Sequence, residues 1–156
     1  MAYTKDEIRS VLVQTAAGRL LLPNANVAEV LAWVRPEPVE NAPSWLLGRF
    51  EWHGWQVPLV SFAPLVGLAD ESARANSRVV VLKALGGSAE LPYFALLAQG
   101  FPRLTTVLRD GLLADASEED LPAGVQMRVL LGDEAALLPD LDNVEAKIGA
   151  ALAQAA

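Results

Sequence analysis

The chain has 156 residues, of which 53% are hydrophobic and 20% charged, and a formal net charge of −7 at pH 7. This length and composition indicate one folded domain. The twelve lysines and arginines are scattered along an acidic chain, which argues against nucleic-acid binding. No apolar run reaches the roughly 20 residues of a membrane span, and the N-terminus lacks a signal-peptide pattern. We therefore expect a cytoplasmic protein with no direct membrane insertion, as the lack of cysteine also indicates.

The first half of the chain predicts short strands separated by turns. Residues 8–23 indicate a hairpin, because two apolar runs flank Ala16-Ala17-Gly18. Residues 24–34 fit a helix or a strand, and their periodicity does not decide between the two. The next expected elements are strands at 46–52 and 55–61, a helical turn at 62–66 and a polar linker at 69–77.

The second half repeats this pattern and ends in a helix. A hairpin is expected around Gly86-Gly87-Ser88, and Asp140 or Asp142 is positioned to cap an alanine-rich C-terminal helix. The stripe along that helix consists of Val144, Ile148 and Leu152. The other expected elements are strands at 101–108, 125–131 and up to about 138, and an acidic solvated loop at 113–124.

These elements predict a mainly β fold with few, short helices. Short strands joined by tight turns favour small barrels, because closure of a sheet removes its exposed edges. The approximate halves 8–68 and 76–140 are weakly similar to each other, which indicates two similar subdomains. The pattern leaves open whether the two subdomains exchange strands. We treat 1–156 as a single domain, with the C-terminal helix at 140–156.

The chain lacks the side chains that most catalytic sites need. His53 is the only histidine, there is no cysteine, and no Gly-x-Ser-x-Gly elbow occurs. One histidine with scattered carboxylates gives no metal-ligand spacing, and the run Glu118-Glu119-Asp120 is typical of a solvated loop. We expect no catalytic residue, no metal site, no cofactor and no enzymatic activity.

The segment FEWHGWQV at 50–57 predicts a tight hairpin with His53 and Gly54 as its turn residues. A type I′ turn needs positive φ at both positions, which glycine adopts freely and histidine tolerates. This register pairs Trp52 with Trp55, Phe50 with Val57, and Gly48 with Leu59. Trp52, Trp55 and Pro58 are therefore expected to be structural residues of the hairpin.

Residues 41–68 resemble the central signature of CheW-like domains, the scaffold proteins of bacterial chemosensory arrays. The signature contains an apolar-x-Gly unit, a turn glycine, an apolar-Pro-apolar-apolar strand and a short helix that ends in apolar-Gly. The matching positions are Pro43, Gly48, Gly54, Val57, Pro58, Leu59, Val60, Leu65 and Gly67. Residues 27–34 are similar to the family's Val-x-Glu-Ile element, with Glu29 in its acidic position, and the resemblance spans roughly residues 8–148.

The resemblance implies two five-stranded SH3-like barrels around a common core. It also implies an adaptor that links the cytoplasmic tips of chemoreceptors to the regulatory domain of a histidine kinase. The candidate partner-binding residues are Glu29, Arg49, Glu51, His53 and Gly54. We expect the side chains of the first four to face solvent, and Leu59 and Val60 to be buried.

Two departures from the family pattern stand out. His53 stands where the family usually has arginine, and Ser61-Phe62 replaces Asp-Leu. These departures are consistent with a divergent adaptor, for example one from a chemosensory system that controls type IV pili and twitching. The alternative from another class is a β-barrel that binds a small apolar ligand in a pocket lined by Phe50, Trp52, Trp55 and Phe62.

Overall fold

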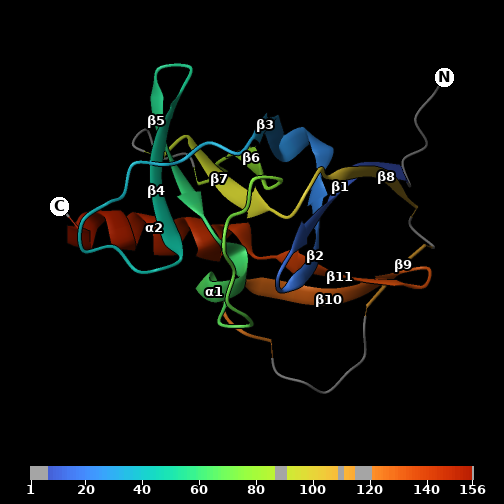
Figure 1. Ribbon diagram of the computed structural model, residues 1–156. Coiled ribbons are helices and arrows are strands. Elements are labelled where there is room, and N and C mark those ends of the chain that lie inside the picture. Colours follow the sequence, from blue (N-terminus) through green and yellow to red (C-terminus); the bar gives the residue numbers. More distant parts are fainter. Residues whose placement is uncertain (1–6, 87–90, 109–110, 115–120, 156) are drawn as a thin grey trace.

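A computed structural model describes residues 7–86, 91–108, 111–114 and 121–155. The strands are β1 (Glu7–Thr15), β2 (Gly18–Pro23), β3 (Val27–Ala32), β4 (Leu46–Trp52), β5 (Trp55–Val60), β6 (Arg78–Lys83), β7 (Tyr93–Ala98), β8 (Arg103–Leu108), β9 (Leu112–Ala114), β10 (Val125–Leu131) and β11 (Glu134–Pro139). The helices are η1 (Asn24–Asn26), α1 (Phe62–Leu65) and α2 (Leu141–Ala155). The prediction of a mainly β fold with a C-terminal helix is confirmed (Figure 1).

The strands form two sheets. The sheet in the order β3-β6-β7-β5-β4 is called barrel 1 below, and the sheet in the order β8-β1-β2-β11-β10-β9 is called barrel 2. Within the described residues, barrel 2 has six strands instead of the expected five, because the three-residue β9 pairs with β10. The N-terminal hairpin β1–β2 belongs to barrel 2, so this sheet draws on both ends of the chain.

Barrel 1 closes through a backbone contact beside Gly48. The amide N–H groups of Glu37 and Arg49 donate to each other's carbonyl oxygens at 2.8 and 2.9 Å, which joins the chain after β3 to the edge strand β4. Gly48 has a φ of 146°, and a Cβ there would lie 2.3 Å from the Glu37 carbonyl oxygen. Only glycine allows this approach, because any side chain would displace the Glu37 backbone.

In the described part of the chain, buried apolar side chains form three clusters, one of which lies between the two sheets. One fills barrel 1 around Phe50 and Val81, and a second fills barrel 2 around Leu12 and Val129. The third and largest lies between the sheets and includes residues of α1, α2 and both barrels. This arrangement of two small barrels around a common core agrees with the SH3-like fold that the resemblance implied.

The helix α2 packs on the shared core with the stripe that its sequence predicted. Val144 and Ile148 are fully buried, and Leu152 packs against the same cluster. Of the two candidate caps, Asp140 is the one in place, since its Oδ1 accepts a hydrogen bond from the Asn143 N–H at 3.2 Å. None of the helices in the described ranges is long and apolar enough to cross a membrane.

The remaining expectations have mixed outcomes. The hairpin at 8–23 is confirmed, and 27–32 is a strand that pairs with β6. The hairpin between β6 and β7 is also confirmed in its strands, while residues 87–90 of its turn lie outside the described residues. Most of the acidic loop at 113–124 is likewise outside them. The segment 69–77 contains no helix or strand.

Candidate functional site

The β4–β5 hairpin has the predicted register and turn. Trp52 pairs with Trp55, Phe50 with Val57, and Gly48 with Leu59. His53 and Gly54 have φ angles of 49° and 82°, as a type I′ turn requires. A bulge between Leu46 and Gly48 turns Leu47 toward the core of barrel 1, a change that simple alternation did not predict. The hairpin projects beyond the rest of the sheet (Figure 1).

The solvent exposure of the candidate residues agrees with expectation. Glu29, Arg49, Glu51, His53 and Gly54 are exposed, and the His53 side chain is 69% exposed. Leu59 and Val60 are fully buried. Pro58 is buried as well, where it faces Arg49 across the hairpin.

The structure brings three of the sequence-predicted residues together at the end of the hairpin. The indole Nε1–H of Trp52 donates a hydrogen bond to Glu29 Oε1 at 2.9 Å. The His53 Nε2 atom lies 3.5 Å from the same carboxylate oxygen. The Trp52 and His53 rings meet edge to face, with centroids 4.5 Å apart. Glu29 on β3 therefore anchors the hairpin end, whereas Arg49 and Glu51 alternate to the opposite face of β4.

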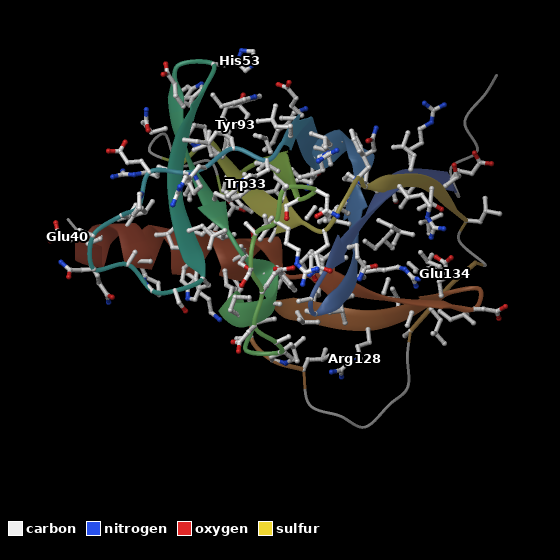
Figure 2. The ribbon with its side chains drawn as sticks, in the orientation of Figure 1. Trp33, Glu40, His53, Tyr93, Arg128 and Glu134 are labelled. Atoms are coloured by element: carbon white, nitrogen blue, oxygen red, sulfur yellow. The ribbon has the colours of Figure 1, made fainter. Side chains whose placement is uncertain are left out.

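Tyr93 completes this group, although it was not among the residues predicted from the sequence. Its ring lies 4.8 Å from that of Trp52 and 6.1 Å from that of Trp55, and Figure 2 shows it beneath the hairpin end that carries His53. Trp55 remains 45% exposed. We call these residues the tip cluster: Glu29, Trp52, His53, Gly54, Trp55 and Tyr93. The only sequence signal for Tyr93 was its place at the start of an apolar strand.

The aromatic residues proposed to line a ligand pocket are divided between different parts of the structure. Phe50 packs in barrel 1, Phe62 is fully buried in the shared core, and Trp55 is largely exposed. A cavity of about 570 Å³ lies elsewhere, between β2, β10, β11 and the start of α2. The four aromatic residues thus do not form the wall of one pocket.

A second exposed surface lies where the chain passes from barrel 1 to barrel 2. Phe101, between β7 and β8, is 74% exposed, and so is Leu104 on β8. The Arg78 guanidinium carbon lies 4.7 Å from the centre of the Phe101 ring. We call Arg78, Phe101 and Leu104 the junction surface. Apolar side chains that form one exposed patch commonly mark an interaction site, and residues 101–108 had been predicted only as a strand.

Both the sequence and the fold of the chain are similar to those of known proteins. The model of the CheW-like domain matches residues 9–147, which span both barrels and the start of α2. The solved structure of the scaffolding protein TtCheW from Thermoanaerobacter tengcongensis is similar, with a TM-score of 0.72 and 16% identity over 86% of this chain and 89% of that chain. Among the curated proteins, none matches this chain.

Proposed function

Since the chain belongs to the CheW-like domain family, we propose that it is a non-enzymatic adaptor that links chemoreceptors to a chemosensory histidine kinase. The observation that carries this proposal is the presence of two separate exposed surfaces, the tip cluster and the junction surface, on two barrels that share one core. An adaptor must hold two partners at once, and two surfaces meet that requirement. We place the protein in the cytoplasm, in a pathway that controls twitching or another form of motility.

We assign the tip cluster to the regulatory domain of the kinase. The cluster presents an exposed indole at Trp55 beside the polar groups of Glu29 and His53. Tryptophan surrounded by polar side chains is typical of the central residues of protein interfaces. Gly54 belongs to the turn inside this cluster, and Arg49 and Glu51, on the other face of the same hairpin, would be contacted by a kinase domain that surrounds the hairpin.

We assign the junction surface to the cytoplasmic tip of the receptor. Phe101 and Leu104 are mostly exposed, more so than Trp55 in the tip cluster. A partner that covers them therefore removes more apolar surface per residue from water. More apolar interfaces are typical of partners that stay bound. A contact of this kind suits a receptor on which the adaptor resides.

The assignment is tested by calorimetry with the cognate kinase regulatory domain and a receptor-tip fragment. We expect Trp55→Ala to weaken kinase-domain binding about tenfold or more, because interface tryptophans carry a large share of the binding free energy. Binding of the receptor fragment should stay within about twofold. Phe101→Ala, a matched loss of an exposed aromatic ring, should show the reverse pattern.

Two outcomes would count against these proposals. If the wild-type chain binds neither partner, the adaptor function is wrong. If each variant weakens both partners equally while its thermal unfolding midpoint is unchanged, the division into two surfaces is wrong.

A further inference from the structure

Glu71 lies in the segment between α1 and β6 that the sequence indicated to be a linker. Its carboxylate is nevertheless a hydrogen-bond acceptor for several other parts of the chain. It accepts three hydrogen bonds from groups that are far apart in the sequence. The donors are the Ala16 N–H at 2.8 Å, the Ser61 hydroxyl at 2.7 Å and the Gln99 side-chain amide at 3.2 Å. Hydrogen bonds to an ionised carboxylate are stronger than those between neutral groups.

These three donors belong to different barrels. Ala16 is in the turn of the β1–β2 hairpin of barrel 2, whereas Ser61 and Gln99 directly follow β5 and β7 of barrel 1. The Gln99 N–H also donates to the Gln14 carbonyl oxygen of β1 at 2.8 Å. One carboxylate therefore joins the two barrels at the point where the chain crosses between them.

The crossing that Glu71 holds also carries the junction surface. Gln99 is two residues before Phe101, and Arg78 begins β6 directly after the segment that contains Glu71. The tip cluster is far from this contact, because Ser61 and the hairpin turn are at opposite ends of the six-residue strand β5, about 20 Å apart along an extended chain.

We propose that Glu71 is a positioning residue that fixes the crossing between the barrels and thereby the junction surface that receives the receptor. This inference rests on the proposed function. Glu71 contacts no partner itself and acts through Gln99 and the β1–β2 turn.

The test is Glu71→Gln, which keeps the size of the side chain but replaces one acceptor oxygen with a donor amide. We expect receptor-fragment binding to weaken about fivefold to tenfold, because at least one of the three hydrogen bonds is lost. Binding of the kinase regulatory domain should stay within about twofold, and amide hydrogen exchange at Ala16 should accelerate. General destabilisation would instead weaken both partners alike.

A second variant tests whether Glu71 acts through the crossing. Gln99→Leu removes the side-chain donor at an exposed position and should weaken receptor-fragment binding in the same direction. If both residues act through one contact, the double variant Glu71→Gln/Gln99→Leu should bind about as well as Glu71→Gln alone. Gln126→Leu, an exposed glutamine on β10, serves as the matched control and should bind like the wild type.

The outcomes separate this inference from the function on which it rests. Loss of receptor binding confined to Glu71→Gln and Gln99→Leu supports it. Unchanged binding in Glu71→Gln, equal weakening of both partners, or effects that multiply in the double variant would overturn it. Failure of the wild-type chain to bind the receptor fragment would overturn the proposed function instead.

Discussion

At the hairpin turn, His53 both adopts the backbone conformation of the turn and places its side chain beside Glu29. Its φ of 49° is in the left-handed region that histidine tolerates better than most residues. Its imidazole also lies near the Glu29 carboxylate that already accepts the Trp52 indole hydrogen. An arginine here would present a planar fork of five donors, which an imidazole does not reproduce. Under the proposed function, the residue at this position would therefore determine which groups on a partner are recognised.

We expect His53→Arg to strengthen binding to the regulatory domain of a conventional chemotaxis kinase about tenfold. The physical reason is that the guanidinium forms paired, charge-assisted hydrogen bonds with a carboxylate. Calorimetry with that domain and with the cognate domain measures the change. His53→Lys supplies the same charge without the fork and should gain less. Equal binding by all three proteins would show that His53 acts only as a turn residue.

At the scale of the elements, an ion pair links strands that are not neighbours in barrel 2. Arg103 on β8 donates to Glu134 at the start of β11, with β1 and β2 between them in the sheet. The hydrogen bond from Arg103 lowers the pKa of Glu134 below its usual range. A lowered pKa in the folded state means that the carboxylate stabilises the fold at neutral pH. This contribution is lost as the pH falls through that lowered pKa.

We therefore predict that Arg103→Gln raises the pKa of Glu134 toward its ordinary value, as followed by NMR titration of the side-chain carboxyl carbon. The unfolding midpoint of the variant should be slightly below that of the wild type at pH 7, because exposed ion pairs are weak. The difference should disappear under acidic conditions that protonate Glu134 in both proteins. Arg35→Gln, in an exposed loop, is the control. An unchanged Glu134 titration in Arg103→Gln would contradict the assignment.

The elements that the sequence predicted well are those whose contacts are local. The β4–β5 register followed from a two-residue turn and from alternation along each strand. The strand at Val27–Ala32 could not be distinguished from a helix, because it is partly buried on both faces and so shows no clear alternation. The bulge at Leu47 was not predicted, although it lies beside Gly48, where the Glu37 backbone approaches β4 and where a glycine inside a strand often marks a bulge.

The residues of the proposed sites divide in the same way. The exposed hairpin residues could be predicted, because a strand that projects into solvent keeps its local alternation. Tyr93 and Glu71 could not, since their partners lie far along the chain; Ala16, for example, is 55 residues from Glu71. A glutamate in a small, polar segment has the same local pattern whether it is solvated or joins two barrels. Only the three-dimensional arrangement of the two barrels shows that Glu71 joins them.

At the scale of the whole molecule, the two barrels share one core. Ile148 of α2 is fully buried in a cluster that contains Leu20 of barrel 2 and Leu82 of barrel 1. Neither sheet can lose these contacts without exposing apolar surface of the other to water. The two barrels should therefore unfold together.

We predict that Ile148→Ala lowers the free energy of unfolding by about 2–5 kcal/mol, the usual cost of a cavity at a fully buried isoleucine. Tryptophan fluorescence reports on barrel 1, since all four tryptophans lie in or beside its strands. Hydrogen exchange at Val129 reports on barrel 2. Both probes should shift by the same amount. Leu113→Ala, at a 59% exposed position, should change stability by less than about 0.5 kcal/mol, and separate transitions would contradict a shared core.

Barrel 2 takes strands from both before and after barrel 1 in the sequence. The two sheets therefore receive their last strands at different times during synthesis on the ribosome. Every strand of barrel 1 lies between Val27 and Ala98, whereas β1 and β2 at the start of the chain must pair with β8 and β11 near its end. As the chain emerges from its N-terminus, barrel 1 has all of its strands first. The β1–β2 hairpin meanwhile keeps the apolar side chains of Leu12 and Leu21 uncovered until residues 125–139 arrive. β1 and β2, which are translated before the other strands, are thus among the last to be enclosed, and the nascent chain is most exposed to aggregation in that interval.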